Sequence, residues 1–130
     1  SARMWSWLFT YDNGKTADKL YVPVGQPVKI ELIAEDVLHS FYVPAFRVKR
    51  DTVPGMINWV WFTAEQPGSY DLFCAEYCGV GHSAMVTTVE ALPDKEFHAW
   101  LTASAACLPL KSGEINSRWS MKAKACVLLI

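Results

Sequence analysis

The sequence predicts an all-β fold, an antiparallel sandwich or barrel with one short helix near residue 100. Three observations predict it: short apolar stretches are separated by Pro and Gly turns, one stretch alternates apolar and polar residues, and a helical period is nearly absent. Short strands joined by such turns are typical of sandwiches and barrels, in which sheets pack face to face around one core.

Several strands are expected, and local signals set their boundaries. Asn13-Gly14 predicts a turn after the aromatic N-terminal segment. Residues 28–35 alternate with a period close to two, as in a strand with one buried face. Pro44 closes the strand that precedes it. The expected strands cover residues 20–24, 28–35, 39–43, 57–63, 69–73 and 86–91.

The short helix is expected over residues 93–101. Pro93 suits the first turn of a helix, and two acidic residues follow it where the helix dipole favours negative charge. Phe97 and Trp100 fall on one face, which we expect to pack against the strands. His98 lies off that face and is expected at the surface.

Length and composition indicate one domain with a single core. The 130 residues are 52% hydrophobic, yet no apolar run reaches the roughly 18 residues that a membrane span needs. No signal peptide is recognisable at the start. Residues 1–98 carry 12 acidic and 8 basic side chains. This acidic body suits a basic protein partner and argues against nucleic acid.

We expect the domain to end at residue 103, and residues 104–130 to form a tail without a readable function. The tail could be native sequence or residues appended for expression. Cys107 and Cys126 could form a disulfide, although nothing in the sequence requires one. Neither begins the C-x-x-C-H motif of covalent haem attachment.

The segment 74–85 carries the chemistry of the chain. Cys74, Cys78, His82 and Met85 follow one another at C-x3-C-x3-H-x2-M spacing. Thiolate and thioether sulfur select copper, and imidazole also suits it. A second imidazole, His39, is available upstream after an apolar pair. These five side chains predict a copper site, with two coppers favoured.

Other readings of this segment stay open. A disulfide between Cys74 and Cys78 would be strained within so tight a loop. Structural zinc would use the thiols and imidazoles but not the thioether of Met85. A single blue copper would use one cysteine, two histidines and a weak methionine, which leaves Cys74 unused.

The segment 74–85 resembles the binuclear copper-A loop of cytochrome c oxidase subunit II. Three more segments resemble that subunit and follow in the same order, namely residues 5–11, 35–44 and 46–55. The whole match runs from about Met4 to Leu101. The resemblance implies a cupredoxin-like Greek-key β-barrel or sandwich, with the ligand loop joining two strands at one end.

The resemblance also implies a role for each site residue. Cys74 and Cys78 would each bridge both coppers, and Met85 would be a weak axial ligand. His39 and His82 would each bind one copper. The backbone carbonyl of Glu76 would complete the set, while its carboxylate would face a magnesium ion at the border with the catalytic subunit. Trp5 would lie at the docking surface, as the site of electron input.

The implied function is electron transfer in a haem-copper terminal oxidase. The chain would accept electrons from cytochrome c, or a similar donor, and pass them to haem in catalytic subunit I, without turnover of its own. We expect it on the periplasmic face of a bacterial cytoplasmic membrane, attached through segments absent from this sequence, in preference to the mitochondrial inner membrane. The alternatives are the copper-A domain of nitrous oxide reductase, a nitric oxide reductase, or a copper carrier.

Two positions depart from the family pattern. Met56 stands where an arginine is common, and Trp59 stands where relatives often carry a polar residue. Alternation places Trp59 and Trp61 on one face of their strand. For Trp59 we favour a position in the core over contact with a partner subunit.

Overall fold

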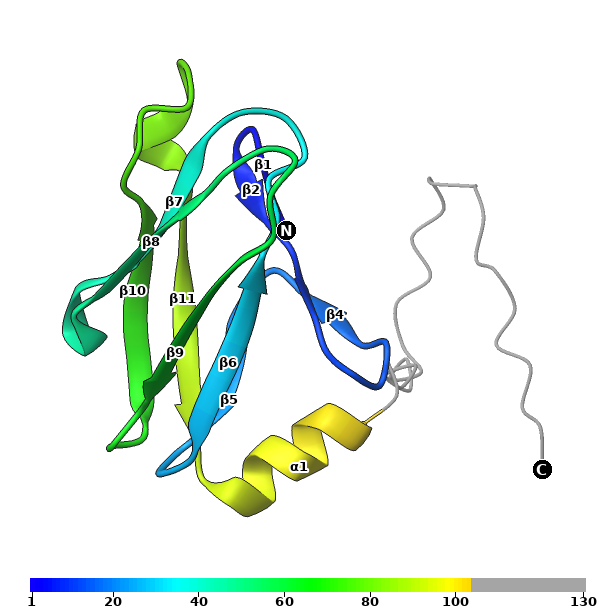
Figure 1. Cartoon of the computed structure of the whole chain (residues 1–130). Helices are drawn as coiled ribbons and strands as arrows, with labels where there is room; N and C mark the ends of the chain where they lie inside the picture. Colours follow the sequence, from blue (N-terminus) through cyan, green and yellow to red (C-terminus); the bar gives the residue numbers. More distant parts are fainter. Residues whose placement is uncertain (104–130) are drawn as a thin grey trace, which may run out of the picture.

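The strands form a curled, barrel-like sandwich in the computed structural model, which describes residues 1–103 (Figure 1). The expectations for the tail, Cys107 and Cys126 lie outside the described residues. Within residues 1–103, no helix is both long and apolar enough to cross a membrane.

The larger sheet has five strands and holds the functional end of the molecule. Its strands follow the order β5-β11-β10-β7-β8. Their bounds are Leu20–Pro23 for β5, Val86–Leu92 for β11, Gly68–Cys74 for β10, His39–Val43 for β7 and Val48–Thr52 for β8. Three of its four pairings are antiparallel, so β7 and β11 both run alongside β10 in the opposite direction.

Within the described residues, three two-stranded sheets complete the sandwich. They pair β6 with β9, β1 with β2 and β3 with β4, and their strands are β1 (Ala2–Arg3), β2 (Ser6–Trp7), β3 (Phe9–Thr10), β4 (Thr16–Ala17), β6 (Pro27–Leu32) and β9 (Asn58–Thr63). The hairpin β1–β2 lies at the end of the molecule opposite the helix α1 (Asp94–Thr102) (Figure 1).

The core lies between these sheets. Phe41 and Leu72 are fully buried at its centre, and the indole of Trp7 meets Phe41 edge-on at 5.9 Å between ring centroids. Burying aromatic and aliphatic side chains of this size is the main favourable term in folding. Three residues of the ligand segment, Cys74, Cys78 and Met85, belong to the same core.

The helix is confirmed as α1 (Asp94–Thr102), one residue inside the expected start. Its Trp100 stacks on Tyr21 at 4.0 Å between ring centroids and meets Tyr11 edge-on. Phe97 is half-buried beside it, and His98 is exposed, as the sequence predicted. The helix therefore closes the end of the barrel farthest from the hairpin β1–β2.

Two expectations were wrong. The arrangement is not wholly antiparallel, because β5 pairs with β11 in parallel. The chain leaves β5 through a tight turn at Gly25, where φ is +75°, and enters the other sheet rather than folding back. Trp59 is not in the core either: half of its surface is exposed, because Val60 and Phe62 occupy the inward positions of β9.

Candidate metal centre

Three adjacent strands bring the predicted site residues together. His39 begins β7, Cys74 ends β10, and Met85 directly precedes β11. Since Cys74 is paired with Phe41 and Phe73 with Val86, these residues lie at the same end of three neighbouring strands inside the sheet. A short 3-10 helix, His82–Ala84, carries the second histidine within the connecting loop.

The two thiols lie side by side, and each has an imidazole next to it. Cys74 Sγ is 3.8 Å from Cys78 Sγ. His39 Nδ1 lies 3.8 Å from Cys74 Sγ, and His82 Nδ1 lies 3.6 Å from Cys78 Sγ. The ligand atoms of His39, Cys74 and Cys78 all lie within 4.8 Å of one another, and His82 joins this group through Cys78.

Two further donors complete the cluster. The thioether Sδ of Met85 lies 3.9 Å from Cys78 Sγ. The backbone carbonyl of Glu76 accepts a hydrogen bond from the Cys74 thiol at 3.3 Å. The Glu76 carboxylate points elsewhere, to Lys49 Nζ at 2.9 Å. Only the backbone of this residue therefore belongs to the donor cluster.

Most of the cluster is shielded from solvent. His39 and Met85 are buried, as are both thiols, whereas His82 is partly exposed. Burial, together with the neighbouring Cys74 thiol, raises the pKa of Cys78 to about 11. In the metal-free chain this thiol is therefore protonated near neutral pH, so that a metal must displace the proton as it binds.

His39 is held in place by Asp36, a residue that was not among the predicted site residues. His39 Nε2 lies 2.8 Å from Asp36 Oδ1, which leaves Nδ1 free to face Cys74. The Asp36 carboxylate also accepts hydrogen bonds from the backbone N–H groups of Met4 and Val37. Although desolvation acts in the opposite direction, these hydrogen bonds lower the pKa of Asp36 to about 2.

The carboxylate of Asp36 fixes the imidazole that donates to the site, as partners of metal-binding histidines commonly do. Its position three residues before His39 was the available sequence signal. That signal is weak, because an acid at this spacing is far more often only solvated.

Trp5 reaches the cluster from the tip of the hairpin β1–β2. Its indole Nε1–H donates to the carbonyl oxygen of Cys78 at 3.2 Å. The side chain keeps 42% of its surface exposed. The Trp5 indole is therefore partly exposed to solvent and also hydrogen-bonded to the backbone of Cys78.

The donor set is compatible with copper. It offers two thiols, two imidazole nitrogens, a thioether and a carbonyl in a chain of contacts none longer than 3.9 Å. Zinc has little use for the thioether. Cys74 and Cys78 are free thiols, since their sulfur atoms are 3.8 Å apart and a disulfide bond is roughly 2.05 Å long.

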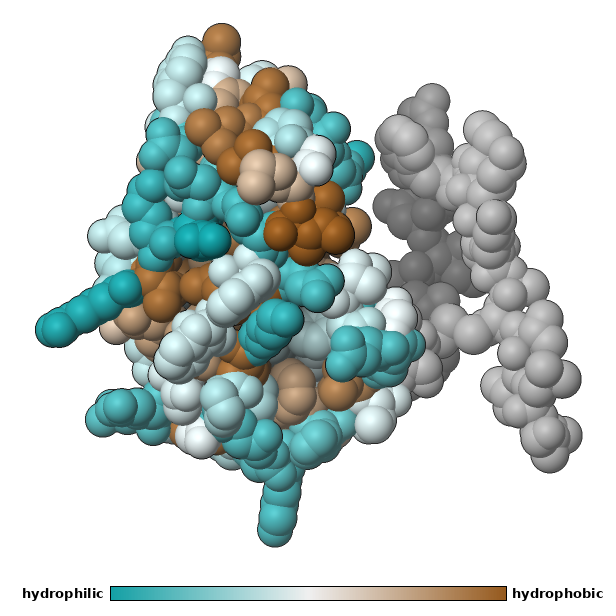
Figure 2. Space-filling view, in the orientation of Figure 1, coloured by the Kyte–Doolittle hydropathy of each residue, from teal (hydrophilic) through white to brown (hydrophobic). Residues whose placement is uncertain are grey.

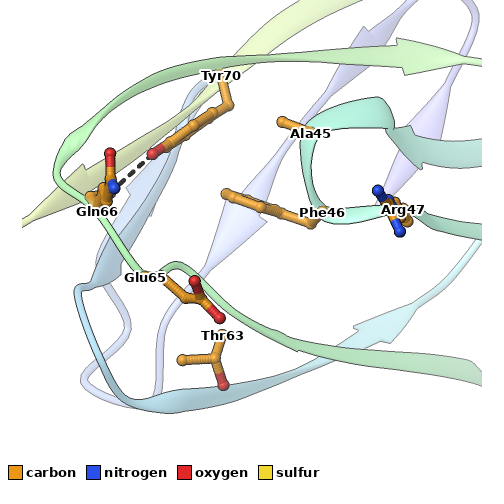
Figure 3. A pocket seen from close by; sticks show the side chains of 7 residues that line it. All are labelled: Ala45, Phe46, Arg47, Thr63, Glu65, Gln66 and Tyr70. Carbon is orange, nitrogen blue, oxygen red and sulfur yellow. Dashed lines mark hydrogen bonds between the residues drawn. The ribbon is translucent and has the colours of Figure 1, made fainter.

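A cleft elsewhere offers no comparable chemistry. It opens where β9 ends and β10 begins, and its lining contains neither a cysteine nor a histidine (Figure 3). Tyr70 donates a hydrogen bond to the Gln66 carbonyl within it. The lining residues are Ala45, Phe46, Arg47, Thr63, Glu65, Gln66 and Tyr70. Among the described residues, the donor cluster remains the strongest candidate site.

A family model supports the resemblance found in the sequence. Residues 9–92 match the model described as the periplasmic domain of cytochrome c oxidase subunit II. Cytochrome c oxidase subunit 2 of Alkalihalophilus pseudofirmus is 47% identical over 102 residues, which cover 77% of this chain and 30% of that protein. The chain thus spans about 30% of the length of this curated relative.

Solved structures agree with the sequence relatives. The periplasmic domain of cytochrome oxidase subunit II from Bradyrhizobium japonicum superposes with a TM-score of 0.71 at 33% identity, covering 75% of this chain and 84% of that one. A haem-copper terminal oxidase dimer gives a TM-score of 0.59 at 33% identity, covering 70% and 59%. The neighbours support the expected cupredoxin-like architecture.

Proposed function

Because the chain belongs to the family of the periplasmic domain of cytochrome c oxidase subunit II, we propose that it is an electron-transfer domain with a binuclear copper-A centre. The observation that carries the proposal is the pair of thiols 3.8 Å apart, each with an imidazole nitrogen within 3.8 Å. When bound, two thiolate-bridged coppers would supply a one-electron redox couple with little structural change.

Each donor then has a distinct part in holding the coppers. Cys74 and Cys78 would hold the coppers through their thiolates, and His39 and His82 would supply the nitrogen ligands. The Met85 thioether and the Glu76 carbonyl would be the remaining, weaker donors. The buried position of the thiols excludes water and favours transfer of electrons over handover of metal. This burial argues against a copper carrier, which must expose its ligands.

The donor would be cytochrome c or a similar electron-transfer protein, docking over Trp5. Hydrophobic residues are visible at the surface of this end of the molecule (Figure 2). Next to Trp5 in sequence or on the ligand loop, Met4, Tyr77 and Val80 are all strongly exposed. We expect apolar contact over this surface, with the acidic body of the domain acting on the approaching donor from a distance.

The acceptor would be haem in catalytic subunit I, within a membrane oxidase of the respiratory chain. The domain would lie on the periplasmic side of a bacterial cytoplasmic membrane. The chain covers about 30% of the length of the curated relative described above, so these partners are proposed for the whole protein.

Copper content and electron paramagnetic resonance test the proposed function. The loaded chain should hold two coppers, with the unpaired electron coupled equally to both nuclei. Coupling to a single copper nucleus would contradict the proposal and favour a blue-copper site. Loading with zinc in preference to copper would favour a structural site instead.

Replacing Glu76 by glutamine should leave the copper spectrum almost unchanged. Only the carbonyl of this residue faces Cys74, while its carboxylate pairs with Lys49. In the intact oxidase the same carboxylate would serve a magnesium site, which the substitution should weaken. Lys49→Gln is the matched control, since it removes the same ion pair from the other side. Loss of the copper-A absorption in Glu76→Gln would show that the carboxylate is a copper ligand.

A further inference from the structure

Two glycines in the ligand loop form a close-fitting slot for the Trp5 indole. A Cβ atom at Gly81 would lie 2.4 Å from Cδ2 of Trp5, and 2.7 Å from its Cγ. At Gly79 a Cβ atom would lie 3.3 Å from Cζ2 of the same indole. The first two separations are shorter than any real contact between carbon atoms allows.

The backbone at Gly81 does not itself require glycine. Its φ of −87° and ψ of 9° are accessible to residues with a side chain. Gly79 differs, because its φ of +114° disfavours any other residue. The effect of an alanine at position 81 would therefore be to fill the space that the Trp5 indole occupies.

The tip of the hairpin is fixed on two sides besides the slot. The Trp5 Nε1–H donates to the Cys78 carbonyl, and the Met4 backbone N–H donates to Asp36 at 2.7 Å. Asp36 in turn holds His39. The position of Trp5 is thus tied to residues next to both thiols.

We propose that Gly81 is a positioning residue for electron input, because the absence of its side chain seats the Trp5 indole against the ligand loop. The slot and the hydrogen bond together keep the indole in contact with the backbone of Cys78. The part that concerns electron input rests on the proposed function. The seating of Trp5 is a property of the metal-free chain and can be tested without copper.

The first test uses the metal-free protein and the indole N–H resonance of Trp5 in a ¹⁵N–¹H NMR spectrum, assigned with Trp5→Phe. In Gly81→Ala this resonance should shift and its exchange with solvent should accelerate, because the indole leaves the Cys78 carbonyl. Ser83→Ala is the control, since Ser83 is exposed in the same loop. An unchanged resonance and exchange rate in Gly81→Ala would overturn the proposal.

The second test is a double-variant cycle in the copper-loaded chain, with reduction by cytochrome c followed by stopped flow. Gly81→Ala should slow electron transfer by about 10-fold to about 100-fold, since a misplacement of about 1 Å can cost up to about 100-fold in rate. It should leave the copper content and absorption spectrum unchanged. In a Trp5→Ala background, which is itself slow, Gly81→Ala should have no further effect.

An equal additional loss in the Trp5→Ala background would overturn the proposal, since Gly81 would then act independently of the indole. If Gly81→Ala alone fails to fold while the double variant folds, the clash with Trp5 is the cause and the slot is supported. If the copper-loaded parent chain takes electrons neither from cytochrome c nor from another small electron-transfer protein, the proposed function fails, and the NMR result still decides whether Gly81 seats Trp5.

Discussion

Asp36→Ala should lower the copper affinity of the domain by about 10-fold to about 100-fold, the loss usual when the partner of a metal-binding histidine is removed. His39 Nε2 would lose its contact with Asp36 Oδ1, now 2.8 Å long, and the ring could rotate so that Nδ1 no longer faces Cys74. The loss should appear when the loaded chain competes for copper with a chelator of known affinity.

The matched control is Asp36→Asn, which keeps a side-chain oxygen to accept from His39 but removes the charge. Its affinity should fall between the parent and Asp36→Ala. Denaturant unfolding of the metal-free variants separates a local effect from a general one, because Asp36 also accepts from the N–H groups of Met4 and Val37. Full copper affinity in Asp36→Ala would show that burial alone holds the His39 ring.

The ligand segment could be predicted from the sequence because its information is local. Cys74, Cys78, His82 and Met85 fall within twelve residues, and a loop that short must keep them close whatever the rest of the chain does. The position of His39 beside this loop depends on more than local sequence, since only the pairing of β7 with β10 brings the two together.

The supporting residues could not be predicted in the same way. The contact between Gly81 and Trp5 joins residues 76 positions apart in the chain, and no periodicity reports such a contact. The exposure of Trp59 was missed for a related reason. Alternation showed that Trp59 and Trp61 share a face, but only the packing of Val60 and Phe62 decides which face is inward.

Among the substitutions of a single donor, replacement of either thiol should have the largest effect, and Cys78→Ser is the sharper test of the two. Cys78 Sγ lies within 3.9 Å of the donor atoms of three other residues, namely Cys74, His82 and Met85. A hydroxyl is a hard donor that cannot replace a bridging thiolate. The loss of copper affinity should therefore exceed the about 100-fold typical of an outer partner, and the shared-electron spectrum should disappear.

The fold should survive this change, because serine is nearly the same size and His82 Nδ1, 3.6 Å from the present sulfur, can accept a bond from the hydroxyl. Circular dichroism and the denaturation midpoint of the metal-free variant check that point. Cys74→Ser is the matched control and should abolish the pair equally, since a bridge needs both sulfurs. A Cys78→Ser protein that still held two coppers with an equally shared electron would mean that Cys78 does not bridge them, and that its three contacts serve only to pack the loop.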